Sequence, residues 1–248
     1  ASERFAVFKL PVDIAIHDSN GKRVHRVWVD ELEENFELPY NGTLRAVVFD
    51  EEKMLLGKIN EDKPQSQYVY QFYNSDRYET RLQSLEGGVE SGNASSDQMI
   101  LDGLNDSFWH IRAKAIQMSA KMASDKQMIS EKIIKNLMFS DPKSQVRAAA
   151  AAFLSKNAKG NDMAGLLNSV IDKDQSYLVI GTALKQLSNL DPDLALASAK
   201  KLENENSSKI MSSVAQVYSV SGREDNAEFF RDLLMNRQLG IYDQLASM

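Results

Sequence analysis

The chain has 248 residues, of which 43% are hydrophobic and 26% charged, and its net charge is −6. These values suit a globular protein of one large domain or two ordinary ones, and they argue against nucleic acid or an anionic membrane surface as a partner. The absence of cysteine excludes disulfides, Cys-ligated zinc and a cysteine nucleophile, and leaves the compartment open. No apolar stretch approaches the ~20 residues of a membrane span. The beginning at Ala1, without an initiator Met or a signal peptide, predicts a piece of a longer protein.

Residues 1–62 are predicted to form a small Ig-like β-sandwich. Asn20-Gly21 predicts a two-residue hairpin, and Asn41-Gly42 predicts a second turn. About sixty residues are few for a closed sandwich, so this region is expected to pack on a neighbour or to lack a strand upstream. The expected strands cover residues 5–16, 24–29, 35–38 (ended by Pro39) and 44–49.

Residues 63–248 are predicted to form an all-α HEAT/ARM-like helical-repeat domain, so the fold class is α+β with segregated domains. A linker helix over 63–86 is expected to begin near Pro64, and residues 87–96 are expected to form a polar loop. Further helices are expected near 97–104, 107–123, 124–138, 141 onward, 161–171, 175–189, 191–203, 207–220, 223–236 and 238–246. The expected N-caps are Ser107, Ser124 or Asp125, Asp141 and Asp191, and Ser221-Gly222 is an expected helix stop.

A short pattern occurs twice in the helical region, 35 residues apart. Asp106-Ser-Phe-Trp-His-Ile-Arg112-Ala is followed by Asp141-Pro-Lys-Ser-Gln-Val-Arg147-Ala, and a weaker copy begins at Asp174 without the arginine. A repeat of this period is typical of a helical solenoid. Because aspartate and arginine keep a fixed spacing, we favour a structural role in which each arginine hydrogen-bonds the aspartate of its own or the adjacent repeat. The alternative makes Arg112 and Arg147 ligands for an anion or carboxylate.

The residues predict no catalytic, cofactor-binding or metal-binding set. The histidines His17, His25 and His110 lie too far apart in sequence to form a helical metal-binding pair. His17 and His25 can face each other across the Asn20-Gly21 hairpin, but solvated or packing roles are favoured. The acidic run over residues 30–34 lacks the spacing of a calcium loop. The Gly-rich segment 87–92 has no lysine and no preceding strand, so a flexible loop is expected.

The order of these elements resembles the C-terminal part of the M1 family (gluzincin) zinc aminopeptidases. The residues that carry the resemblance are 8–16, 44–50 and 54–56 in the strand region, Lys63, Gln71, Tyr78 and Arg81 in the linker helix, 109–112 and 146–149 in the first HEAT-like turns, and Tyr177, Ala183-Leu184, Tyr218, Gly222 and Phe229-Phe230 in the later helices. The catalytic motifs of that family, His-Glu-x-x-His and Gly-x-Met-Glu-Asn, do not occur here. No catalytic residue is therefore carried over.

The resemblance implies a non-catalytic C-terminal region that supports and caps a catalytic domain absent from this chain. It places zinc in that missing domain and none in the present chain, which is expected to be inactive as a peptidase. The implied partners are the catalytic and N-terminal domains of the same parent protein, and a peptide substrate is met only through the parent. The alternative is a stand-alone HEAT-type adaptor, which accounts for the helical repeats but not for the strands before them.

Overall fold

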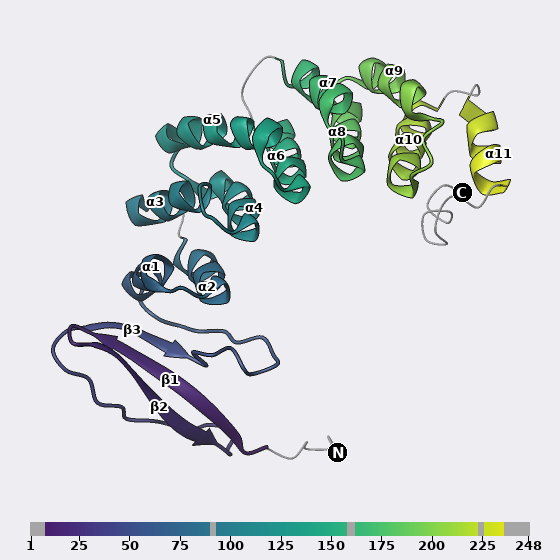
Figure 1. Cartoon of the computed structure of the whole chain (residues 1–248). Helices are drawn as coiled ribbons and strands as arrows, with labels where there is room; N and C mark the ends of the chain where they lie inside the picture. Colours follow the sequence, from purple (N-terminus) through teal and green to yellow (C-terminus); the bar gives the residue numbers. More distant parts are fainter. Residues whose placement is uncertain (1–7, 90–92, 158–161, 223–225, 236–248) are drawn as a thin grey trace. The chain divides into compact units, whose positions relative to one another are not determined.

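The computed structural model describes residues 8–89, 93–157, 162–222 and 226–235 (Figure 1). In these ranges a three-stranded antiparallel sheet comes first and eleven α-helices follow. The fold is therefore α+β with a helical C-terminal region, as predicted. It divides into two compact units, unit 1 of residues 1–99 and unit 2 of residues 100–248. None of the described helices is long and apolar enough to cross a membrane.

Unit 1 begins with the sheet, whose strand order is β2-β1-β3. The strands are β1 (Leu10–Asp18), β2 (Gly21–Val29) and β3 (Leu44–Phe49). Alternation along β1 places Val12, Ile14 and Ile16 in a buried apolar cluster on one face. The partly buried side chains that pack against this cluster are Val27, Val29, Leu38, Leu44, Val47, Phe49 and Leu55.

The first hairpin is confirmed, although Gly21 already belongs to β2 and the turn consists of Ser19 and Asn20. The strand expected over residues 35–38 is wrong, since the structure has an irregular segment there. Pro39 lacks an N–H and cannot extend a strand pairing. Leu38 packs on the apolar face as a single side chain and not as part of a strand.

The possible pairing of His17 with His25 across the hairpin is also wrong. His17 lies opposite Lys22, whereas His25 lies opposite Ile14. Directly opposed residues share a face of the sheet, and neighbours along a strand alternate between faces. The two histidines therefore project from opposite faces.

Two helices replace the single linker helix predicted over residues 63–86. α1 (Gln65–Asn74) and α2 (Tyr78–Gly88) are separated by an extended connection, in which Ser75 Oγ accepts a hydrogen bond from the Arg77 N–H at 3.2 Å. Such a local side-chain bond competes with helix continuation. The predicted loop over 87–96 is also too long, because α2 extends through Gly88 and α3 (Ala94–Gly103) begins at Ala94. Residues 90–92 of that loop lie outside the described residues.

Close packing explains why a Gly-Gly pair ends α2 instead of forming a loop. A Cβ added at Gly87 would lie 2.6 Å from the ring of Tyr68, and one at Gly88 would lie 2.8 Å from Tyr68 Cβ. Only residues without a side chain permit this approach between α1 and α2. The glycines thus serve helix packing in unit 1.

Side chains from the segment before α1 and from α1 itself close the outer edge of β3. Gln67 Oε1 accepts from the Val47 N–H at 2.9 Å, and Lys63 Nζ donates to the Val47 carbonyl at 3.0 Å. Glu61 Oε1 accepts from the Phe49 N–H at 3.3 Å. An exposed strand edge invites pairing with another protein molecule, and these bonds satisfy its backbone groups. The predicted domain boundary at 62–63 thus runs through contacts that hold α1 to the sheet.

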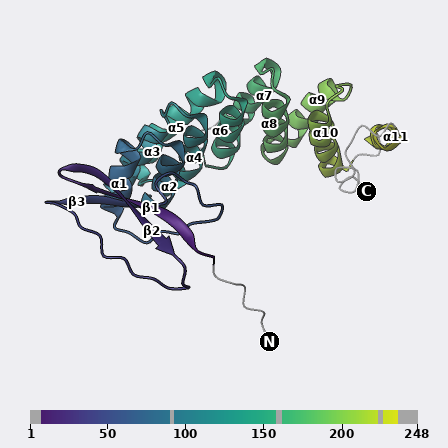
Figure 2. The ribbon, with the colours of Figure 1, turned by 60° about the horizontal axis from the view of Figure 1, so that its bottom comes forward.

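In the described part of unit 2, helices pack against one another in sequence order (Figure 2). α4 contacts α6, α6 contacts α8, and α8 contacts α10, while α5, α7 and α9 each pack beside the even-numbered helix that follows. The alanine run in α6 is part of this packing, since Ala150 and Ala151 are fully buried. The helices are α4 (Trp109–Met118), α5 (Ser124–Ser140), α6 (Ser144–Asn157), α7 (Met163–Lys173), α8 (Tyr177–Leu190), α9 (Pro192–Leu202), α10 (Ser208–Ser221) and α11 (Ala227–Met235), with a 3-10 turn η1 (Ser119–Lys121) after α4.

The predicted helix ends are confirmed in two places. Asp191 Oδ1 accepts from the Leu194 N–H at 3.0 Å and Pro192 occupies the first turn of α9, as expected for a cap followed by proline. Gly222 ends α10 with a left-handed φ of 59°. The helix predicted over 238–246 lies outside the described residues.

The predicted caps, Ser107 for one helix and Ser124 or Asp125 for the next, are wrong. α4 is preceded by Phe108 and α5 by Ala123, and neither helix start receives a side-chain cap. Before α4 the hydrogen bond comes from further upstream, since Asp106 Oδ1 accepts from the Phe108 N–H at 2.7 Å. The side chain that organises this helix start therefore lies three residues before the helix.

Candidate functional site

Three helices of unit 2 begin with the same aspartate turn. Oδ1 of Asp106, Asp141 and Asp174 accepts from the backbone N–H two residues further on, at 2.7, 2.8 and 2.8 Å. Aspartate favours this turn because its short carboxylate reaches the backbone just ahead of it. The turns precede α4, α6 and α8, and the weaker third copy of the sequence pattern thus keeps the local geometry of the first two.

Each repeat arginine joins its own helix start to the next one. Arg112 donates from Nε and Nη2 to the two carboxylate oxygens of Asp141 at 2.7 and 2.8 Å, and from Nη1 to the Asp106 carbonyl at 2.9 Å. Arg147 repeats this arrangement, with bonds of 2.7 and 2.9 Å to Asp174 and of 2.7 Å to the Asp141 carbonyl. Two-pronged arginine–carboxylate bonds of this kind combine charge with a fixed orientation. We call the two arrangements the Arg–Asp bridges.

The Arg–Asp bridges are largely buried. The side-chain exposures are 11% for Arg112 and 1% for Asp141, and 17% for Arg147 and 9% for Asp174. The hydrogen bond with its aspartate raises the pKa of each arginine. Burial would raise the pKa of Asp174, but the bonds from Arg147 and from the Ser176 N–H hold it below its ordinary value. With their donors engaged inside the fold, both guanidinium groups are poorly placed to bind an external anion.

A similar pattern, which we did not predict, occurs in unit 1. Ser75 Oγ accepts from the Arg77 N–H before α2, as the aspartates do before α4, α6 and α8, and Arg81 follows Ser75 by the same six residues. Serine in place of aspartate obscured this copy. In the third copy Ile180 occupies the arginine position, so Asp174 is the last acceptor in this run of repeats.

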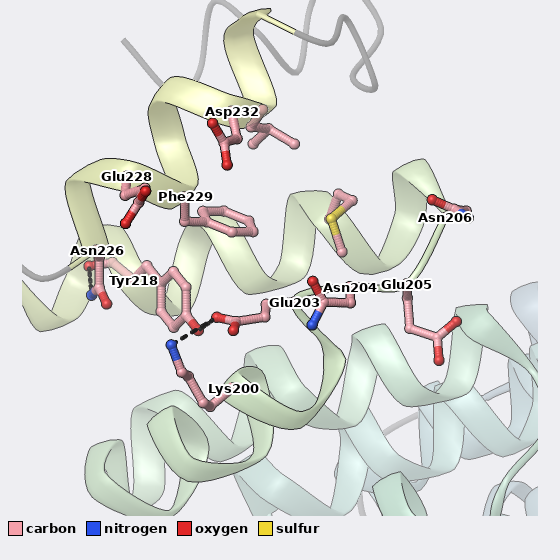
Figure 3. Close-up of a pocket in the computed structure, with 12 residues that line it drawn as sticks. Lys200, Glu203, Asn204, Glu205, Asn206, Tyr218, Asn226, Glu228, Phe229 and Asp232 are labelled. Atoms are coloured by element: carbon pink, nitrogen blue, oxygen red, sulfur yellow. Dashed lines mark hydrogen bonds and ion pairs between the residues drawn. The ribbon is translucent and has the colours of Figure 1, made fainter.

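A polar cavity of about 370 Å³ lies between the α9–α10 connection and α11 (Figure 3). Tyr218 donates a hydrogen bond to Glu203 Oε2 at 2.8 Å, and Lys200 forms an ion pair with Glu203 at 3.2 Å. The ring of Phe229 from α11 meets Tyr218 edge-on at 4.9 Å. The other carboxylates that line the cavity belong to Glu205, Glu228 and Asp232. The excess of carboxylates among these lining residues favours cations over anions.

Tyr218 makes the stability of unit 2 sensitive to alkaline pH. The pKa of Tyr218 is raised above its ordinary value of 10.0, mainly by burial and also by the hydrogen bond to Glu203. The folded protein then keeps a proton that the unfolded state loses, so stability falls as pH rises above about 10. We expect Tyr218→Phe to lose less stability than the parent between about pH 9 and about pH 11 in urea unfolding. Tyr40→Phe, at an exposed tyrosine, is the control, and equal losses for the parent and Tyr218→Phe would contradict the assignment.

The histidines do not converge on a site. His17 lies edge-on to Tyr70 at 5.7 Å, and His110 stacks on Trp109 at 5.2 Å. Burial lowers the pKa of His17, which favours its neutral form. Within the described residues, no three histidine or acidic side chains lie close enough together to hold a metal ion.

No protein-family model matches this sequence, and a search of curated proteins finds no relative. The resemblance to M1 family aminopeptidases therefore depends on the sequence patterns alone. Two of the residues that carry it, Lys63 and Gln71, are hydrogen-bonded to each other at 3.0 Å in unit 1.

Proposed function

We propose that this protein is a non-catalytic region that supports and caps a catalytic domain, as the C-terminal part of M1 family zinc aminopeptidases does. The observation that carries the proposal is the pair of Arg–Asp bridges, which use the best-defined charged residues of the repeats to fix one helix start to the next. Charged groups committed in this way stabilise a scaffold and are not available for chemistry. Zinc and the peptide substrate belong to the catalytic domain of the parent protein.

The packing of unit 2 supports a HEAT-like identity for its helices. Successive helices contact in sequence order, and the aspartate turns recur at α4, α6 and α8. A solenoid in which each repeat contacts only its neighbours has these properties. The proposed role of this part is to present an extended surface to the catalytic domain.

The sheet of unit 1 supports the view that a further domain packs beside it. We propose that it is part of a β-sandwich, although the described residues contribute one sheet of three strands. Several large apolar side chains are exposed on or next to β1 and β2, namely those of Phe8, Leu10, Val24 and Trp28. Exposed apolar area of this kind often marks a protein interface.

A stand-alone adaptor that binds a protein partner is the second candidate. The helical repeats fit an adaptor as well as they fit the aminopeptidase-type region, but an adaptor does not account for the sheet. The upstream coding sequence distinguishes the two candidates. A His-Glu-x-x-His motif upstream of Ala1 supports the peptidase parent, and a start codon near Ala1 supports the adaptor.

The proposal is tested by separating the two parts of the parent protein. We expect the present 248 residues, purified without chelators, to cleave no aminoacyl-4-nitroanilide and to contain no stoichiometric zinc by emission spectrometry. The upstream part alone is expected to lose thermal stability or activity and to regain it when the present protein is added in trans. One tightly bound zinc per molecule would refute the proposal. It would also be refuted if adding the present protein changed neither the thermal stability nor the activity of the upstream part.

A further inference from the structure

Two Asn-Gly pairs meet at one end of the sheet in unit 1. Asp18 accepts the Asn20 N–H through Oδ1 at 2.8 Å and the Asn41 N–H through Oδ2 at 2.7 Å. Ser19 Oγ donates to the Asn41 carbonyl at 3.3 Å and accepts from the Thr43 N–H at 3.1 Å. The turn between β1 and β2 is thus hydrogen-bonded to the turn that precedes β3.

We propose that Asn41 is a site of spontaneous covalent modification, and that Asn20 is protected from the same reaction by the fold. The Gly42 backbone nitrogen loses its proton to water and attacks Cγ of the Asn41 side chain. A new bond between this nitrogen and Cγ closes a five-membered succinimide ring, the bond from Cγ to Nδ2 breaks, and ammonia leaves. Water then opens the ring at either carbonyl and leaves aspartate or isoaspartate at position 41. No oxidant or reductant takes part.

Exposure does not distinguish the two asparagines, since both are exposed, but their backbones differ. Gly21 is the first residue of β2 and is paired with Asp18, so its nitrogen can reach the Asn20 side chain only if the hairpin opens. Gly42 lies outside the strands, and its N–H makes no hydrogen bond within the described part of the protein. The Asn41 side-chain amide is likewise without a hydrogen bond in that part of the structure.

The hydroxyl of Ser19 favours the reaction at Asn41. When the Gly42 nitrogen is deprotonated, its negative charge spreads by resonance onto the Asn41 carbonyl oxygen. Ser19 Oγ already donates to this oxygen in the folded protein. A donor positioned where charge develops stabilises the reacting state.

The fold requires the glycine that makes Asn41 reactive. Gly42 has a φ of 72°, and a Cβ at this position would overlap Ser19 Oγ. A side chain is therefore excluded both by the backbone conformation and by space. The residue that permits the turn is the residue that leaves the Asn41 side chain open to attack.

The isoaspartate product cannot keep the hydrogen bonds that join the two turns. It inserts a methylene group into the backbone between Cα of residue 41 and the Gly42 nitrogen, which changes the spacing between the residue 41 N–H, held by Asp18, and the Thr43 N–H, held by Ser19. The former Asn41 carbonyl, which accepts from Ser19, becomes a free carboxylate beside Asp18, whose own carboxylate is buried. We therefore expect faster amide hydrogen exchange in β1 and β2 of the modified protein.

The test is peptide mapping by mass spectrometry after incubation of the whole protein at neutral pH. We expect conversion at Asn41 to be roughly tenfold faster than at Asn20 in the folded protein, a ratio that corresponds to about 1.4 kcal/mol of opening free energy. In denaturant the two rates should converge, because the hairpin no longer protects Asn20. The control Asn41→Gln should abolish conversion at position 41 and leave Asn20 unchanged. Equal rates in the folded protein, or conversion at Asn41 only after denaturation, would overturn the proposal.

Discussion

Replacing Asp141 by alanine is expected to lower the free energy of unfolding of unit 2 by about 3–5 kcal/mol. The Asp141 carboxylate accepts hydrogen bonds from Nε and Nη2 of Arg112, and the Asp141 side chain is 1% exposed. Its removal leaves the Arg112 guanidinium in a largely buried position without a counter-ion, and it also removes the acceptor of the Lys143 N–H before α6. Urea unfolding followed by circular dichroism measures the loss.

Three further variants separate the causes of this effect. Asp141→Asn keeps an oxygen for the Lys143 N–H and removes only the charge, so we expect an intermediate loss. Arg112→Met combined with Asp141→Ala should recover part of the stability, because no ion is then left alone. Asp172→Ala breaks the exposed ion pair with Lys201 and should cost under about 1 kcal/mol. A loss for Asp141→Ala no larger than that for Asp172→Ala would show that the Arg–Asp bridges do not stabilise unit 2.

Replacing Lys63 by alanine is expected to destabilise unit 1 by a comparable amount, about 3–5 kcal/mol. The Lys63 side chain is 8% exposed and forms an ion pair with Glu61 at 2.9 Å. It also donates to the Val47 carbonyl and to Gln71 Oε1. Because the ammonium group is poorly hydrated, burial lowers the pKa of Lys63. Without the ammonium group, the Glu61 carboxylate loses its counter-ion and the Val47 carbonyl at the edge of β3 loses its hydrogen-bond donor.

A double variant tests whether the unpaired glutamate causes the loss. Glu61→Gln removes the charge and keeps an oxygen for the Phe49 N–H. We therefore expect Lys63→Met combined with Glu61→Gln to be more stable than Lys63→Met alone. Lys9→Ala, at an exposed ion pair with Asp30, is the control and should have little effect. If Lys63→Ala resembles Lys9→Ala in thermal unfolding, the closure of the β3 edge does not depend on this lysine.

Local chemistry made several features predictable. Gly222 ends α10 because it adopts a left-handed conformation readily, and Asp191 with Pro192 begins α9 because each suits a free helix end. The aspartate and arginine of the repeat were recognisable because they keep a spacing of six residues in two copies. The aminopeptidase-type parent stays a prediction, since the sequence patterns alone suggest it. The HEAT-like assignment stays a proposal, which the packing of unit 2 supports.

Other features depend on contacts that no local pattern reveals. The single linker helix predicted over 63–86 fails because Ser75 binds the backbone locally, and the loop predicted from residue 87 fails because Gly87 and Gly88 pack on Tyr68. The aromatic spacing over that segment is compatible with one helix or with two. Packing between the two helices decides in favour of two.

The order of the amino acids was enough to show that aspartate and arginine recur together, that strands give way to helices, and where several helices end. These properties follow from local backbone preferences and from the spacing of side chains. The folded arrangement was needed to show that Arg112 binds the carboxylate of Asp141 and not that of Asp106, and that Lys63 closes the edge of β3. These contacts join residues 29 and 16 positions apart. They depend on which elements pack together, which is a property of the assembled fold and not of any one segment.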